Sequence, residues 1–373
     1  MEAALLDEFA RGDAREREES WRYSKPALRA LAQQTFADAN AQADVSPSLI
    51  ERWAWAETQG SRIVFVNGAF AASLSNIDAL AASVRVEHGS DHSLALTICA
   101  DVPQPIHLVY ANIPGLAPSR WSARTAIHVT NARATIVEQH VGDSGADVLG
   151  ALVSDLQVGA RSEVRYVALD DVPASCSLYR RVDADIATSA MLDAVHALFG
   201  GRLQRFDLNV GLVGERARFV SHGAFGVRGR EHVDVHFDVR HRARDTACDL
   251  VWRGIADERG RGVFHGAITV EAGADGAEAQ LSNKNLLLSA NAEIDTQPVL
   301  EIHADEVKAA HGATVGQLDE RALFYLRSRG LPTDIARGLL IGAFCRSVFA
   351  DAPLRDRIDA LLDLRLGANG ERA

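Results

Sequence analysis

Histidine is the residue type in this sequence best suited to chemistry, because a neutral imidazole binds metals and titrates near neutral pH. The chain has 13 histidines. The pattern His232-x-Asp234-x-His236 could place three ligand-type side chains on one face of a strand. The alternating Val and Phe residues give the same spacing in an ordinary solvated strand, and the sequence favours that second interpretation.

A further histidine, His311, stands alone before Gly-Ala-Thr. The local pattern by itself is typical of a hydrogen-bonded turn residue. Imidazole can also ligate iron, and histidine replaces cysteine in some iron–sulfur centres. Both interpretations stay open on the residues alone.

The four cysteines are far apart and form no C-x-x-C pair, which excludes a zinc ribbon and a local cluster-binding loop. Their apolar or strand-like surroundings predict buried small side chains, with a ligand role still open for one of them. They are Cys99, Cys176, Cys248 and Cys345.

The sequence lacks the catalytic motifs of several enzyme classes. The sequence contains no G-x-x-x-x-G-K-[ST] loop, no G-x-S-x-G elbow and no H-E-x-x-H helix, so a partner would have to handle any ATP. A net charge of -11 argues against a nucleic-acid surface. The first residues mix acids and bases without an apolar stretch, unlike a signal or transit peptide, so we expect a cytoplasmic protein.

Hydrophobic periodicity divides the chain into three regions. Residues 1–60 are charged and predict a helical region, with WRYSKP (Trp21–Pro26) as an aromatic anchor that packs a helix end onto the core. Ser61–Gly68 predicts a strand closed by an Asn-Gly turn. From about residue 96 to residue 315, apolar side chains alternate with polar ones, which predicts many short strands. The clearest are 164–169, 177–182, 206–212, 215–220, 232–239, 248–252, 263–270 and 286–288.

The strand pattern indicates a mainly β fold, and it leaves a sandwich, a barrel and a β-solenoid open because no strict repeat is visible. Helical spacing returns at the end of the chain. Asp319 is expected to cap a helix over residues 320–329 that Gly330 ends, and Thr333 is expected to cap the next helix. A last helix is predicted to carry Leu354, Ile358, Leu361 and Leu362.

The segment after residue 282 resembles the SufB/SufD family of iron–sulfur cluster assembly proteins, and WRYSKP resembles that family's amino-terminal signature. The matching elements are NLLLS (Asn285–Ser289), the acid-Asx-Thr-x-Pro segment (Glu293–Pro298), LEIHADEV (Leu300–Val307), HGATVG (His311–Gly316) and FYLRSRG (Phe324–Gly330).

The resemblance implies a right-handed parallel β-helix core over residues 61–315, flanked by a helical region over 1–60 and a helical domain over 316–373. It implies a non-catalytic subunit of a SufB–SufC–SufD scaffold, which pairs with SufB through the β-helix and with the SufC ATPase through the carboxy-terminal helices. A homodimer is possible when SufB is absent. No stably bound cofactor is implied: an iron–sulfur cluster is shared transiently with SufB, and SufC binds the ATP.

The same resemblance places particular residues in roles. His311 matches a histidine at the SufB interface that is implicated in nascent cluster assembly, which also makes it a candidate iron ligand. The contact with SufC would lie near Arg329, Gly330, Ala336, Leu340 and Phe344.

Departures from the family pattern favour the SufD branch. SufB-type chains are longer and carry a cysteine in this region, and many relatives have Cys where Ala309 stands here. Two alternatives remain. One is a SufB-like scaffold that holds a cluster by itself, which the dispersed cysteines disfavour. The other is a carbohydrate-active β-helix enzyme, which would need clustered carboxylates and usually export.

Overall fold

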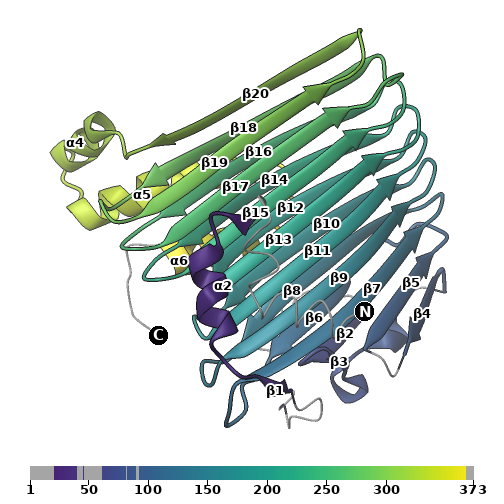
Figure 1. The fold of residues 1–373 in the computed structure, drawn as a ribbon, viewed down its shortest axis with the longest axis horizontal. Coiled ribbons are helices and arrows are strands. Elements are labelled where there is room, and N and C mark those ends of the chain that lie inside the picture. Colours follow the sequence, from purple (N-terminus) through teal and green to yellow (C-terminus); the bar gives the residue numbers. More distant parts are fainter. Residues whose placement is uncertain (1–20, 40–44, 46–60, 81, 90–91, 367–373) are drawn as a thin grey trace.

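The computed structural model describes residues 21–39, 45, 61–80, 82–89 and 92–366. Its centre is a parallel β-helix whose coils stack from β2 and β4 at one end to β19 and β20 at the other (Figure 1). Each coil contributes one long strand to each of two sheets. The resemblance to a β-helix family is therefore confirmed at the level of fold.

From β5 onward the strands alternate between two sheets, which we call the odd-numbered and the even-numbered sheet. The odd-numbered sheet holds, in order, β19 (Glu293–Ile302), β17 (Arg261–Val270), β15 (His232–His241), β13 (Leu203–Leu212), β11 (Cys176–Ile186), β9 (Val148–Val158), β7 (Ser119–Val129), β5 (Ser93–Ile98) and β4 (Val84–His88), with β1 (Ala37–Asp38) beside β7. The even-numbered sheet holds β20 (Val307–Gly316), β18 (Ala277–Leu287), β16 (Ala247–Ala256), β14 (Arg218–Val227), β12 (Met191–Gly200), β10 (Glu163–Val172), β8 (Arg133–Gly142), β6 (Ile106–Asn112), β2 (Ser61–Val66) and β3 (Ala69–Phe70).

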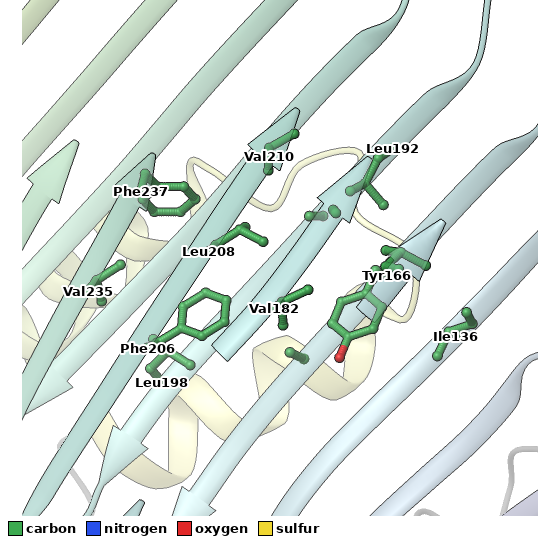
Figure 2. Packing of buried hydrophobic residues seen from close by; sticks show 14 of the residues in the cluster. Ile136, Tyr166, Val182, Leu192, Leu198, Phe206, Leu208, Val210, Val235 and Phe237 are labelled. Atoms are coloured by element: carbon green, nitrogen blue, oxygen red, sulfur yellow. The ribbon is translucent and has the colours of Figure 1, made fainter. Parts of the chain in front are cut away.

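The core lies between the two sheets, in the bore of the β-helix. Parallel pairing in register stacks each inward side chain on its equivalent in the next coil, as Val182, Leu208 and Phe237 do across β11, β13 and β15 (Figure 2). Every second residue of a strand faces the bore, which is why the sequence shows period-2 alternation. Burying these rows removes apolar surface from water and gives the stack its stability.

The Asn-Gly turn predicted after residue 66 is present. Asn67 and Gly68 have φ of 48° and 81°, and they join β2 to the antiparallel β3. The rest of the predicted 1–60 helical region lies outside the described residues, apart from residues 21–39 and 45. Within it, helix α2 (Lys25–Ala32) starts where Pro26 sets the backbone for a first helical turn.

Helices cover both outer faces of the β-helix (Figure 1). Helix α2 lies on the odd-numbered sheet, where Leu28 and Leu31 pack beside Tyr179 and Leu203. After β20 come α4 (Glu320–Ser328), α5 (Thr333–Arg346) and α6 (Arg355–Leu366). Helices α5 and α6 pack on the even-numbered sheet. No helix among the described residues is long and apolar enough to cross a membrane.

The helix ends agree with the sequence in part. Asp319 accepts a hydrogen bond from the Arg321 amide at 2.8 Å, and Gly330 has a φ of 90°, so both expected ends of α4 are confirmed. Thr333 does not cap α5, because it is the first helical residue and Pro332 occupies the cap position without a side-chain bond. Leu354 lies just before α6.

Candidate functional site at the open end of the β-helix

The last coil, formed by β19 and β20, ends both sheets. In the described part of the chain, each of these strands pairs with a neighbour on one edge alone, β19 with β17 and β20 with β18. Most of β20 is exposed. A free strand edge presents unpaired N–H and C=O groups, which makes it a template for a strand of another chain.

His311 lies in the middle of β20, so the turn expected from its local sequence is wrong. It is in register with Leu281 of β18, and Leu281 is in register with Leu250 of β16. These two leucines are buried in the bore, so His311 continues their row. It is exposed because no further coil covers it. The structure therefore places an imidazole at the mouth of the bore, between two free strand edges.

Asparagines from the NKNLLLS stretch lie buried beneath the last coil. The Asn285 amide donates to Asn283 Oδ1 at 2.6 Å and to the Thr314 carbonyl of β20 at 3.1 Å. The Thr296 hydroxyl of β19 donates to Asn283 Oδ1 at 2.8 Å. The two sheets are thus joined beneath Ala313 and Val315 of β20, next to His311, and this network positions the last coil.

Ala309 lies two residues before His311 on the same face of β20. It is half-buried, packs against the core, and is in register with Ala279. A thiol at this position would lie next to the imidazole on the final bore-facing row. In this chain the row offers the histidine alone.

The expected SufC-contact residues extend from the turn between α4 and α5 to the end of α5, and they differ in exposure. Arg329 is exposed, and its guanidinium lies 5.3 Å from the centre of the Tyr325 ring. Gly330 is exposed, whereas Leu340 and Phe344 are half-buried. Ala336 is fully buried, so its side chain supports the packing of α5 and has no surface of its own.

Three exposed apolar side chains in this region were not foreseen. Phe324 and Tyr325 of α4 are 72% and 56% exposed, and Leu339 of α5 is 50% exposed. The signal was available, because FYL stands in the FYLRSRG motif and a helix with three-four spacing cannot bury three consecutive apolar residues. The adjacent Phe324 and Tyr325 leave apolar surface in water, and exposed apolar patches are typical of interaction surfaces.

The strand pattern His232-x-Asp234-x-His236 does not form a three-ligand metal site. Ser24 of the WRYSKP segment donates to Asp234, and the His232 ring lies 2.9 Å from the same hydroxyl. Arg205 donates to Asp234 Oδ2 at 2.9 Å and stacks over Trp21. In the described residues, no three His, Cys, Asp or Glu side chains gather as a metal site would require. The WRYSKP segment, with Trp21 and Ser24 buried, is the aromatic anchor that the sequence predicted.

Three of the four cysteines are buried as expected, and Cys99 is not. Burial raises the pKa of Cys176, Cys248 and Cys345 to about 12, so these thiols are protonated at neutral pH. Cys99 follows the last residue of β5, where the alternation turns its side chain outward.

A charged cluster inside the bore was missed by the sequence analysis. Arg180 of β11 lies 2.8 Å from Glu138 of β8 and donates to Asp170 of β10 at 2.7 Å. Glu138 also contacts His140 at 2.9 Å and accepts a hydrogen bond from Tyr166. All five side chains are buried. Their places in the alternation mark them as inward-facing, which is the one signal the sequence carried.

The pKa values of groups in and beside this cluster are strongly shifted. Burial alone would raise the pKa of Glu138, but Arg180, His140 and Tyr166 outweigh it and lower that pKa to about 2. Burial lowers the pKa of the neighbouring His196 to about 3, with Arg180 adding to the effect. The cluster therefore holds a buried ion pair beside neutral imidazole, an arrangement stable only while each charge keeps its partner.

Comparisons with known proteins agree with this architecture. The model of the SufBD core domain, SUF system FeS cluster assembly, matches residues 116–344, more than half of the chain. An iron–sulfur cluster assembly SufBD family protein of Synechocystis is 27% identical over 391 residues, covering 91% of this chain and 83% of that protein.

Two proteins named iron–sulfur cluster assembly protein SufD are also similar. The one from Escherichia coli is 30% identical over 239 residues, covering 63% of this chain and 56% of that protein. The one from Bacillus subtilis is 25% identical over 222 residues, covering 59% and 51%. The matches to these two span about half of their length. With a parallel β-helix whose family motifs meet at its open end, the chain belongs to the SufBD family of the SUF iron–sulfur cluster assembly system.

Proposed function

We propose that this protein is a non-catalytic, SufD-type scaffold subunit that pairs with SufB and binds the SufC ATPase in the cytoplasm. The observation that carries the proposal is the open last coil, where His311 is exposed between two free strand edges. Membership of the family supports a role in iron–sulfur cluster assembly. The geometry supports one surface for SufB and another for SufC.

Pairing with SufB would use β19 and β20. A strand of the partner can add to either free edge through backbone hydrogen bonds, which would continue the sheets across the two chains. His311 would then lie inside the interface, where a neutral imidazole can ligate iron together with groups of SufB. The nascent cluster is cargo shared by the two chains. Without SufB, the same edge could pair with a second copy of this chain.

Binding of SufC would use the helices α4 and α5. Phe324 and Tyr325 are exposed on α4 and Leu339 is exposed on α5, the two helices that are joined by the turn containing Arg329 and Gly330. Helix α6 ties this region to the β-helix, because Arg365 forms an ion pair with Asp171 of β10. Movement of a bound ATPase could therefore reach the sheets as strain. ATP would be bound by SufC.

A SufB-like scaffold that holds a cluster alone is less well supported. Three cysteines are buried with a raised pKa and lie on separate elements, β11, β16 and α5. Thiolate ligands of a cluster must be deprotonated and must converge. An iron content near zero in the purified chain is the expected result, and stoichiometric iron and sulfide would contradict the division of roles.

The test of the proposal is co-expression with SufB and SufC from the same source, followed by purification through a tag on this chain and mass determination of the retained proteins. We expect a complex that contains all three proteins. Recovery of this chain alone, or of a homodimer that binds neither partner, would overturn the proposal.

Two pairs of variants, each a test with its control, distinguish the SufB contact from the SufC contact. Ala313→Lys places a charge on the bore-facing row of β20 and should abolish SufB retention, whereas Ala117→Lys in an exposed loop should not. Phe324→Asp should abolish SufC retention, whereas Leu364→Asp on α6, where the residue is 68% exposed, should not. His311→Ala should keep both partners and lose iron–sulfur loading of the complex.

A further inference from the structure

The two free strand edges of the last coil differ in the backbone groups that they present to a partner. Among the described residues, neither β19 nor β20 pairs on its outer side, and β20 ends the stack in Figure 1. In a parallel sheet, the N–H and C=O of one residue point to the same neighbouring strand, and those of the next residue point to the opposite side. The hydrogen bonds to the coil below therefore identify the residues that face outward.

On β19, the odd-numbered residues face β17. The Glu293 amide donates to the Gly260 carbonyl at 3.1 Å. The His303 amide, just after the strand, donates to the Val270 carbonyl at 2.8 Å. The alternation holds between these two bonds, because β19 and β17 pair in unbroken register over all 10 residues of β19. The even-numbered residues therefore face the free edge, and the middle one of them is Pro298.

Pro298 interrupts the outward edge of β19. It has no N–H, and its ring occupies the space through which a partner's carbonyl would approach. Proline on an edge strand, with its nitrogen turned outward, is one of the devices that prevent edge-to-edge pairing. A strand added to β19 would have an unpaired carbonyl in the middle of its ladder, and burying such a group costs free energy.

The free edge of β20 is uninterrupted. The amides of Glu278 and Leu288 on the β18 coil donate to carbonyls on the β16 side at 2.9 Å each, so the odd-numbered residues of β18 face β20. Ala279 of β18 is in register with Ala309 of β20. In a parallel pair, a residue that faces its neighbour lies opposite one that faces away. The odd-numbered residues of β20 therefore face outward, with His311 in the middle and no proline among them.

The side chains of β20 also leave its edge accessible. Most of them are small, and nothing lies within 4 Å of the position that a methyl group would take at Gly312 or Gly316. The strand has 10 residues and pairs with β18 without a bulge. A long free edge that lacks both proline and a bulge can accept a further strand along its whole length.

We propose that the partner chain adds its strand to β20 alone, and that Pro298 keeps the edge of β19 unpaired. This inference rests on the proposed pairing with SufB and specifies which edge the partner uses. The even-numbered sheet, on which α5 and α6 pack, then continues into the partner, whereas the odd-numbered sheet ends at the joint. His311 thus lies beside a joint that a backbone ladder closes on one side only.

Hydrogen exchange of the full chain, alone and in complex with SufB, tests which edge is used. We expect the outward amides of β20 to exchange at least about tenfold more slowly in the complex, because they become hydrogen-bonded. The outward amides of β19 should keep the exchange rates that they have in the chain alone. Equal slowing in peptides from the two strands would overturn the proposal.

A matched pair of proline variants gives a second test. Ala313→Pro removes an outward N–H from β20, and Leu300→Pro removes one from β19. Neither change removes a hydrogen bond to the coil below, because both amides face away from it. Ala313→Pro should weaken SufB binding at least about tenfold, and Leu300→Pro by less than about twofold. Circular dichroism checks that both variants are folded. Equal effects, or the reverse order, would contradict the use of β20 alone.

Pro298→Val restores the missing donor and can be tested without SufB. Sedimentation of the chain alone measures self-association through the open end. We expect Pro298→Val to lower the dissociation constant at least about tenfold, because both edges can then pair. Gln297→Val, whose amide faces β17, should leave it unchanged. Equal self-association of Pro298→Val and the parent chain would overturn the inference. A parent chain that retains no SufB would overturn the proposed function instead, and this measurement would still decide whether Pro298 closes the edge.

Discussion

At the scale of single residues, the buried charges of the bore are the least expected feature of this protein. A β-helix interior can be filled by stacked apolar rows, yet Arg180 lies in it between Glu138 and Asp170. Removing ions from water costs several kcal/mol per ion, and good geometry with further hydrogen bonds must offset that cost. Tyr166 and His140 supply such contacts to Glu138.

Glu138→Gln tests this balance. The substitution keeps the shape and removes the charge, leaving Arg180 with Asp170 alone, so we expect the free energy of unfolding to fall by about 3 kcal/mol. Urea denaturation at pH 7 measures it. The control is Glu278→Gln, which breaks an exposed pair with Lys308 and should have no measurable effect. Equal effects of the two substitutions would contradict a structural role for the buried pair.

At the scale of elements, the turns between strands depend on a few backbone conformations that the coil geometry imposes. Gly200 ends β12 with a φ of 78°, and a methyl group there would overlap the carbonyl oxygen of Val172 on the neighbouring β10. Gly273 has a similar φ of 88°, but nothing lies within 4 Å of the position a methyl group would take. A substitution at Gly273 would therefore cause backbone strain alone, whereas one at Gly200 would cause both strain and steric overlap.

Alanine at these two glycines should therefore have unequal effects. Gly273→Ala should lower the free energy of unfolding by about 1 kcal/mol, because a left-handed backbone is costly for a residue with a Cβ. Gly200→Ala should lower it by about 3 kcal/mol, since overpacking adds to that strain. Denaturation midpoints of both variants give the comparison. Similar losses would show that the β12 to β13 turn relaxes away from Val172.

At the scale of the whole molecule, the β-helix buries several histidines in neutral form. Burial lowers the pKa to about 4 for His107, His232 and His241, and to about 3 for His196. An unfolded chain binds protons at these residues near pH 6.5, and the folded chain does not. The unfolded state therefore gains stability relative to the folded state as the pH falls below 6.5.

We expect the protein to be much less stable at pH 5 than at pH 7. Each histidine with a folded pKa of about 4 should contribute a loss of about 2 kcal/mol at pH 5. The low pKa of Glu138 acts at lower pH, between 4.5 and about 2. Urea midpoints at the two pH values test this, and His107→Gln should reduce the difference. Unchanged or greater stability at pH 5 would contradict it.

The sequence by itself determined most of the strand positions, the ends of α4 and the anchoring role of WRYSKP. The expected strand 215–220 is correct only from Arg218 onward, because residues 215–217 form the turn before β14. Alternation with period 2 marks a face to be buried whatever it packs against. Asp319 and Gly330 act through neighbouring backbone groups. The residues alone could not decide between a sandwich, a barrel and a β-solenoid. The resemblance to a β-helix family added the coil architecture.

The tertiary structure decided which side chains of neighbouring coils lie beside each other. Val182, Leu208 and Phe237 are stacked equivalents, yet they are 26 and 29 residues apart, so unequal coils hide the repeat. The same register joins His236 to His265 and ends the bore at His311. Alternation along one strand cannot specify these neighbours, because cross-coil pairing depends on the length and turn of every coil between them.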